Sequence, residues 1–316
     1  MRILVSNDDG VHARGIRVLS KRLAQEPDNA VYVVAPDRER SATGHSLTLH
    51  KPLRVEEVQL ERSLKGAWST SGTPSDCVKF AVSALLKQPP AVVISGINSG
   101  PNLGSEILYS GTVSAAMEGA FLNIPAIAVS LVGDGEKRYE VAAEFVSRLV
   151  AILPTSGLPS RTVLNVNVPN VSAEEIRGVR ITELGVRLYN DYFEKRMDPR
   201  GKVYYWLAGH AVEEGEGEGT DVRAVLNKMI SVTPLTFNMT DRPIMEKLGS
   251  WMELQRLVDV YRTAGKEPES SDPPSRQADP GSRIGESAAQ GGPGSKLSRR
   301  DRLDSSERNS GLGKEQ

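Results

Sequence analysis

The chain carries short runs of apolar residues, rich in valine and isoleucine, that recur through its first half. These runs lie at residues 2–6, 31–35, 91–95 and 125–130. Continuous apolar runs of this length are typical of strands buried on both faces of a sheet. The segments between them show the spacing of amphipathic helices, at Ile16, Leu19 and Leu23, at Val78, Val82 and Leu85, and at Val113, Met117 and Phe121. Strands that alternate with helices predict an α/β fold with a Rossmann-like, doubly wound, mostly parallel sheet.

The second half of the chain has a looser pattern. We expect strands at residues 162–168 and 179–182, and a β-hairpin arm around residues 204–207. Residues 213–219 alternate glutamate with glycine and predict a flexible acidic loop. Residues 242–262 carry apolar side chains at helical spacing and predict a final amphipathic helix, which could pack on its own core or on a second subunit.

The composition changes near residue 264. From there to the end, serine, glycine, proline, arginine and glutamate dominate, with no aromatic side chain and few large aliphatic ones. So little apolar surface cannot offset the entropy cost of ordering the segment. We therefore predict one folded domain at residues 1–263 and a disordered, low-complexity C-terminal tail at residues 264–316.

Charge and cysteine content narrow the compartment and the partners. Lys and Arg number 39 against 40 Asp and Glu, which leaves a formal charge of -1 and no global field toward nucleic acid or an anionic membrane. Cys77 stands alone, so it forms no internal disulfide and no thiolate metal cluster. The N-terminal apolar run is too short for a signal peptide, and no apolar run is long enough to cross a bilayer. We expect a cytoplasmic protein without a membrane or stable nucleic acid partner, in which any phosphate binding is local.

Two adjacent carboxylates, Asp8 and Asp9, follow the first predicted strand. Parallel α/β sheets bind ligands at the carboxyl ends of their strands. Neighbouring carboxylates repel each other and are most easily tolerated beside a hard divalent cation. The alternative is structural: one of the two caps the next helix while Gly10 makes a turn, and this segment alone does not decide between the two.

Two further loops offer neutral oxygen ligands. Ser41 lies in the polar segment 35–46 after the second strand, although such a segment is often only a connecting loop. Asn98 lies in the glycine-rich segment 95–104 after the third strand, where its amide oxygen suits Mg²⁺ or Mn²⁺ and the glycines let backbone N–H groups converge on an anion. Segment 95–104 lacks the lysine of a Walker P-loop and the dinucleotide-binding glycine pattern, which weakens a kinase or dehydrogenase interpretation.

The third predicted helix opens with Ser110, Gly111 and Thr112. Hydroxyl side chains at such a position usually cap the helix, and the N–H groups there, together with the helix dipole, also bind phosphate. The four segments together supply two carboxylates, neutral oxygens and anion-binding N–H groups. This is the equipment of metal-assisted phosphate ester hydrolysis.

The same segments carry the signatures of a known family. They are MRILVSNDDG at residues 1–10, APDRERSATGHS at 35–46, SGINSGPNLG at 95–104 and YSGTVSAAMEG at 109–119. Their order and spacing resemble those of the SurE nucleotidases, with lesser similarity at residues 71–77, 164–169 and 189–192. The resemblance covers residues 1–263, whereas the tail has no counterpart and residues 240–261 match no motif of the family.

The resemblance implies a SurE-type fold and the hydrolysis of nucleoside 5'- and 3'-monophosphates to nucleoside and phosphate. It implies one divalent cation per subunit, Mg²⁺ or Mn²⁺, and a homodimer or homotetramer formed through the arm and the C-terminal helix. The metal ligands implied by motif matching are Asp8, Asp9, Ser41 and Asn98. We assign catalysis to Asp8 and Asn98, and phosphate binding to Ser110, Gly111 and Thr112.

Two other functions fit the same residues. One is a polyphosphatase that uses the same metal site on a longer anion, and the other is a non-catalytic nucleotide-binding module. Release of phosphate from AMP or GMP separates the binding module from an enzyme. His45 is the one candidate that the sequence offers for a general base, although a lone histidine is more often a hydrogen-bonded structural residue.

Removing the predicted tail tests the domain boundary. A chain cut after Gly265 should keep its turnover and its oligomeric mass, because the removed segment has too few apolar residues to dock on the folded domain. The measurements are phosphate release from AMP and light-scattering mass, before and after truncation. A large loss in either one would show that the tail contributes.

Overall fold

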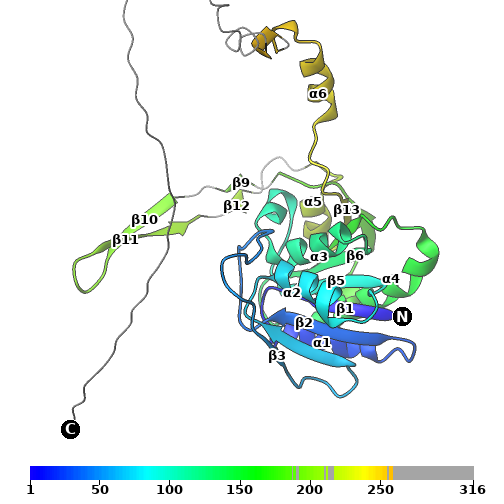
Figure 1. Ribbon diagram of the computed structural model, residues 1–316. Coiled ribbons are helices and arrows are strands. Elements are labelled where there is room, and N and C mark those ends of the chain that lie inside the picture. The colour runs from blue at the N-terminus through cyan, green and yellow to red at the C-terminus, as the bar shows by residue number, and fades with distance from the viewer. Residues whose placement is uncertain (187, 190–191, 210, 213–216, 255, 259–316) are drawn as a thin grey trace, which may run out of the picture. The chain divides into compact units, whose positions relative to one another are not determined.

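The computed structural model describes residues 1–186, 188–189, 192–209, 211–212, 217–254 and 256–258 (Figure 1). The chain divides into two units, Met1–Arg242 and Pro243–Gln316. Within the described residues, no helix is long and apolar enough to cross a membrane. The predicted tail at 264–316 lies outside the described residues, so its disorder stays a prediction.

The first unit is built on one sheet of nine strands. Its order is β3-β4-β2-β1-β5-β6-β7-β13-β8. The strands from β4 to β7 in this order are parallel, whereas β3 runs antiparallel to β4 and β13 antiparallel to β7. Their bounds are β1 Arg2–Ser6, β2 Ala30–Pro36, β3 Val55–Glu57, β4 Gly66–Thr70, β5 Val92–Ser99, β6 Ala126–Val132, β7 Val163–Pro169, β8 Val179–Ile181 and β13 Ile230–Leu235. The predicted mostly parallel sheet and its predicted strands are confirmed.

Helices cover both faces of this sheet, as Figure 1 shows. One face carries α1 (Arg14–Ala24) and α4 (Tyr139–Ser156), and the other carries α2 (Pro74–Phe80) and α3 (Gly111–Phe121). Successive residues of β1 point to opposite faces, so Ile3 belongs to the first cluster and Leu4 to the second, and both are fully buried. The double burial explains why β1 appears in the sequence as an unbroken apolar run.

The helices begin where the sequence offers caps. Thr73 forms a capping box with Asp76 ahead of Pro74, and α2 continues into a π-helical turn, η1 (Ala81–Leu85). The Ser110 hydroxyl accepts a hydrogen bond from the Val113 N–H at the start of α3. The remaining helical elements of this unit are η2 (Gly104–Leu108), η3 (Ala173–Glu175) and α5 (Asp221–Leu226).

A hairpin arm leaves the sheet after β8. Strand β10 (Tyr192–Met197) pairs antiparallel with β11 (Val203–Ala208), and β9 (Leu188–Tyr189) pairs with β12 (Ala211–Val212). The arm is thus confirmed and exposes aromatic side chains such as Phe193 and Trp206. Residues 213–216 of the predicted acidic loop lie outside the described residues.

The prediction of one continuous helix over residues 242–262 is wrong in its described part, whereas residues 255 and 259–262 lie outside the described residues. Helix α6 (Arg242–Gly249) belongs to the second unit and ends at Gly249. The N–H groups of Ser250 and Trp251 turn back to the carbonyls of Lys247 and Leu248. Glycine followed by serine interrupts the helix there because both residues have a low helix propensity, and further helical backbone is present at 252–254 and 256–258.

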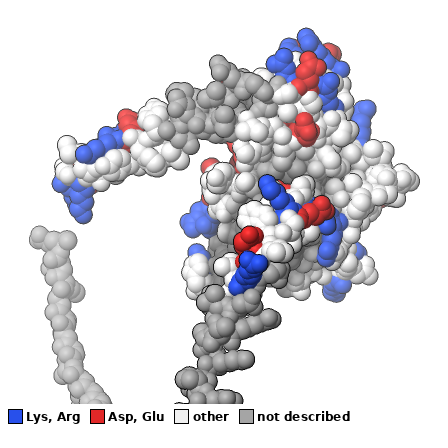
Figure 2. Space-filling model, turned by 90° about the horizontal axis from the view of Figure 1, so that it is seen from above, with Lys and Arg blue, Asp and Glu red and all other residues white. Residues whose placement is uncertain are grey.

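Charge on the surface agrees with the balanced composition. Lys, Arg, Asp and Glu side chains are interspersed on the face drawn in Figure 2. We therefore look for phosphate binding in local geometry, at the edge of the sheet where the predicted site residues lie.

Candidate functional site

The candidate site lies at the switch point of the sheet. Strand β1 pairs with β2 on one side and with β5 on the other, and Val5 is level with Val33 and with Ile94. The loops that follow these three parallel strands therefore leave the sheet at the same edge. Such an edge is the usual ligand site of doubly wound sheets.

Asp8 is held by the first turn of α3. Its side chain is buried, and its carboxylate accepts hydrogen bonds from the Thr112 hydroxyl and from the Thr112 backbone N–H. The positive end of the helix dipole favours a carboxylate at this place. The Asp8 carbonyl also accepts a hydrogen bond of 2.7 Å from the Arg40 N–H, which fixes the loop after β2 beside it.

Gly111 permits the close approach of helix and carboxylate. A Cβ atom at this position would lie 2.7 Å from the Asp8 Cβ and 2.8 Å from its Oδ2. Both distances are far below ordinary van der Waals contact. A glycine is therefore required here for Asp8 to keep its bonds to Thr112.

Asp9 shares the same edge with Asp8. It is partly buried, and its carboxylate accepts a hydrogen bond from the Ser99 backbone N–H. Burial, and next the negative charge of Asp8, raise the pKa of Asp9 to about 6. Burial also raises the pKa of Asp8, with Glu39 adding further negative charge. The two carboxylates thus repel each other in a poorly solvated place, and a bound cation would stabilise their charged forms.

The structural alternative for this pair does not hold. Helix α1 begins at Arg14, its N-cap is Ala13, and no side chain caps it. Gly10 does turn the chain, with a φ of 100°. Neither carboxylate therefore caps α1, the helix that follows them, and the turn at Gly10 exists beside the candidate metal site.

Asn98 and Ser41 offer neutral oxygens at the end of β5 and on the loop that follows β2, the two neighbours of β1. Asn98 follows an irregularity in the pairing of β5 with β6, and its Nδ2 donates to the Gly100 carbonyl at 3.1 Å, which leaves its Oδ1 as the atom able to bind a cation. The Ser41 hydroxyl donates to Glu39 Oε1 at 2.6 Å and keeps its lone pairs. Among the described residues, no group of three His, Cys, Asp or Glu side chains could hold a metal. Two carboxylates completed by neutral oxygens fit Mg²⁺ or Mn²⁺.

The predicted phosphate-binding segment lies next to Asp8. The Ser110 hydroxyl caps α3 through a bond of 3.0 Å to the Val113 N–H, while both polar groups of Thr112 point to Asp8. The side chains of this segment thus have structural partners. Its role in binding phosphate stays a prediction, which depends on the helix dipole and the remaining N–H groups of the first turn.

Sequence reasoning missed a buried carboxylate beside this segment. Glu118, on α3, accepts from His45 Nε2 at 2.8 Å and from Lys79 Nζ at 2.9 Å, and only 3% of its side chain is exposed. Burial alone would raise the pKa of Glu118, but the bonds from His45 and Lys79 hold it below its ordinary value. The sequence did offer a signal for this carboxylate, because Glu118 lies between Met117 and Phe121 in a helix that is otherwise largely apolar.

A second missed feature fixes the loop after Asn98. The Asn102 N–H donates to Asn167 Oδ1 at 3.0 Å, and the side-chain amides of Asn165 and Asn167 donate to the Asn102 carbonyl at 2.9 Å. Asn102 Nδ2 donates to the Ser130 hydroxyl at 2.7 Å. Several buried hydrogen bonds that converge on one residue hold its loop in one conformation, so Asn165 and Asn167 of β7 fix the loop that follows Asn98.

The doubly wound sheet has two adjacent carboxylates at its switch point, and the start of α3 is directed at one of them, Asp8. These features define a class: an α/β protein with a candidate site for metal-assisted phosphate ester hydrolysis. The family model described as survival protein SurE matches residues 3–191. The chain belongs to the SurE family.

Similar proteins extend this match over most of the chain. The protein named 5'-nucleotidase SurE of Heliobacterium modesticaldum is 50% identical over 252 residues, which cover 80% of this chain and 92% of that one. The protein of the same name from Thermosynechococcus vestitus is 54% identical over 258 residues, 80% of this chain and 97% of that one. The crystal structure of the SurE protein from Aquifex aeolicus superposes with a TM-score of 0.68 at 40% identity and covers 82% of this chain and 100% of that chain.

Replacing Gly111 tests the contact between α3 and Asp8. Gly111→Ala should lower the free energy of unfolding by about 1–3 kcal/mol, the usual cost of overpacking, although alanine normally stabilises a helix. The matched control is Gly217→Ala, because a Cβ there would lie 3.9 Å from Thr220 Cγ2, an ordinary contact. Urea unfolding measures both variants, and equal stability of the two would contradict the close approach.

Proposed function

We propose that the protein is a divalent-metal-dependent phosphomonoesterase that hydrolyses nucleoside 5'-monophosphates, and 3'-monophosphates, to nucleoside and phosphate. The observation that carries the proposal is the pair at the switch point, in which Asp8 is buried and held by Thr112 of α3 while Asp9 beside it is partly buried. Membership of the SurE family supports it, since relatives about half identical to this chain are named 5'-nucleotidase SurE.

One Mg²⁺ or Mn²⁺ per subunit would be held by oxygens of Asp8, Asp9, Ser41 and Asn98. When bound, such a cation polarises a phosphoryl oxygen and offsets the negative charge that develops during hydrolysis. The raised pKa values of Asp8 and Asp9 support this assignment, because burial, and for Asp9 also the charge of Asp8, makes their charged forms unfavourable until a cation binds.

The residues of the chain then have separate tasks. Thr112 orients the Asp8 carboxylate through two hydrogen bonds. The bond from Asn98 to the Gly100 carbonyl fixes the direction of the Asn98 amide oxygen. The first turn of α3, at Ser110, Gly111 and Thr112, presents the positive end of its dipole to the same place and would attract the phosphate of the substrate.

We further propose a homodimer or homotetramer in the cytoplasm. The arm supports assembly, because Phe193, Tyr205 and Trp206 are each more than half exposed on it, and aromatic side chains are enriched in protein interfaces. The single cysteine, Cys77, is buried, and its burial raises the pKa of its thiol to about 12. Such a thiol is unreactive. The protein is therefore compatible with a reducing compartment but does not require one to protect the thiol.

Substitution of the carboxylates tests the metal site. Asp8→Asn and Asp9→Asn should each lower phosphate release from AMP at least about 100-fold. Substituting a residue that only supports a metal ligand commonly costs about 10- to 100-fold in metal affinity or activity, and loss of a charged ligand itself should cost more. Chelator should abolish activity of the parent, and Mg²⁺ or Mn²⁺ should restore it.

Stability separates this role from a structural one. The folded protein raises the pKa of Asp9, so the negative charge of Asp9 is unfavourable in the fold. Without metal, Asp9→Asn should therefore melt at a temperature no lower than the parent. With metal, the parent should gain in Tm and Asp9→Asn should not. Asp134→Asn is the control, since Asp134 follows β6 at the same edge of the sheet but is exposed. Full activity of both site variants at ordinary metal concentration would refute the ligand assignment.

A further inference from the structure

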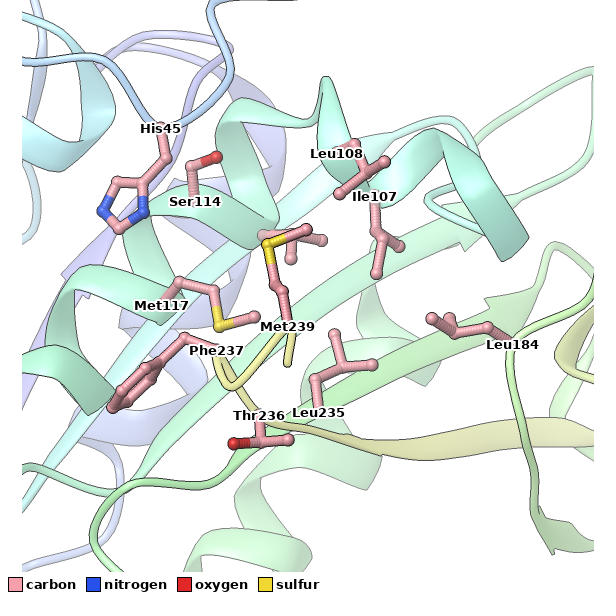
Figure 3. Close-up of a pocket in the computed structure, with 11 residues that line it drawn as sticks. His45, Ile107, Leu108, Ser114, Met117, Leu184, Leu235, Thr236, Phe237 and Met239 are labelled. Atoms are coloured by element: carbon pink, nitrogen blue, oxygen red, sulfur yellow. The ribbon is translucent and has the colours of Figure 1, made fainter. Parts of the chain in front are cut away.

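An apolar pocket lies beside the candidate site. It has a volume of about 330 Å³ and is formed by α3, by η2 and by the segment that follows β13 (Figure 3). Met117, Leu235, Phe237 and Met239 contribute apolar walls. A pocket at the lower end of the range for ligand sites, about 300–1,000 Å³, suits one small ring system better than a large ligand.

The pocket and the candidate phosphate site share helix α3. Thr112 contacts Asp8, while Ser114 and Met117 of the same helix line the pocket. Because a helix rises about 1.5 Å per residue, these positions lie about 3 to 8 Å farther along its axis. This separation is short enough for a molecule with an anionic group at the start of α3 to reach the pocket with the group attached to it.

His45 stands at the rim of this pocket in a fixed position. Its Nε2 is bound by the buried carboxylate of Glu118, which also binds Lys79. The Gly44 N–H donates to the Tyr109 carbonyl at 3.1 Å, so the loop that carries Ser41 and His45 rests on the residue before α3 begins. The imidazole is thus a preorganised polar group on a largely apolar wall, as Figure 3 shows.

Phe237, another residue that lines the pocket, is also held in place. The Phe237 ring packs edge-on against Phe121 with centroids 5.6 Å apart, and the Arg161 guanidinium lies 5.6 Å from its centroid. Rings held in this way lose little freedom when a flat ligand packs against them. Met117 adds a polarisable thioether, which makes favourable contacts with aromatic rings.

We propose that this pocket receives the nucleobase of the substrate and that His45 is a specificity-determining residue, which favours nucleotides over phosphate esters that lack a base. The proposal rests on the proposed nucleotidase function and deepens it. A flat ring with polar edges matches a pocket of apolar walls and one fixed imidazole. A linear polyphosphate, which is charged along its whole length, does not match it.

The test compares AMP with ribose 5-phosphate, which has the same sugar phosphate without the base. The parent should show the higher kcat/KM for AMP. His45→Ala and Phe237→Ala should each lower the ratio of the two kcat/KM values about tenfold, the effect of losing one base contact, mainly through KM for AMP. His50→Ala is the matched control, because His50 is an exposed histidine of the same loop that does not line the pocket, and its ratio should stay that of the parent.

Adenosine binding, measured by calorimetry, tests the pocket without turnover. The parent should bind adenosine, and His45→Ala should weaken that binding about tenfold, as base contacts require. If neither substrate releases phosphate but adenosine binds in this way, the proposed function fails and the pocket assignment stands. If AMP and ribose 5-phosphate are turned over but adenosine binding and the ratio do not change in the variants, the pocket assignment fails alone.

Two further results would overturn the proposal. An equal loss of activity on both substrates in His45→Ala would make His45 part of the catalytic step or of the fold. A change of light-scattering mass in Phe237→Ala with an unchanged ratio would show that a second copy of the chain covers the pocket, whose rim includes the exposed Met239.

Discussion

The contact between the first turn of α3 and Asp8 is the interaction on which the rest of the site depends. Thr112 gives Asp8 two hydrogen bonds, and Gly111 removes the side chain that would keep the helix away. The contact joins a strand end to a helix start across the switch point of the sheet. Because α3 also carries Glu118 and Met117, its position sets the proposed phosphate site and the pocket together.

This arrangement concentrates negative charge where the protein solvates it poorly. Burial raises the pKa of both Asp8 and Asp9, so the charged pair is less favourable in the fold than in water. Structures tolerate such a cost at functional sites and offset it elsewhere. Here the buried sheet core and the network around Asn102 hold the loops in place, and a bound cation would remove the repulsion itself.

The order of apolar and polar residues within short segments was enough to predict the central strands and the loops that follow them. The central strands are buried on both faces and appear as apolar runs, and the site loops follow from the rule that ligands bind at strand ends. Strands β4 and β13 were not predicted: β4 is GAWST, with little apolar content, and β13 pairs with β7 across a long stretch of chain. The bond of Thr112 to Asp8 and the cluster at Glu118 depend on how α3 packs, which no local pattern specifies.

The most direct test of this account is anomalous diffraction from crystals of the protein grown with Mn²⁺. The account predicts a single strong anomalous peak per subunit at the carboxyl end of β1, with oxygens of Asp8, Asp9, Ser41 and Asn98 within about 2.0–2.6 Å, the range of oxygen ligands to hard divalent cations. A peak beyond the reach of both carboxylates would contradict the account. So would the absence of a peak, provided that protein from the dissolved crystals hydrolyses AMP with Mn²⁺.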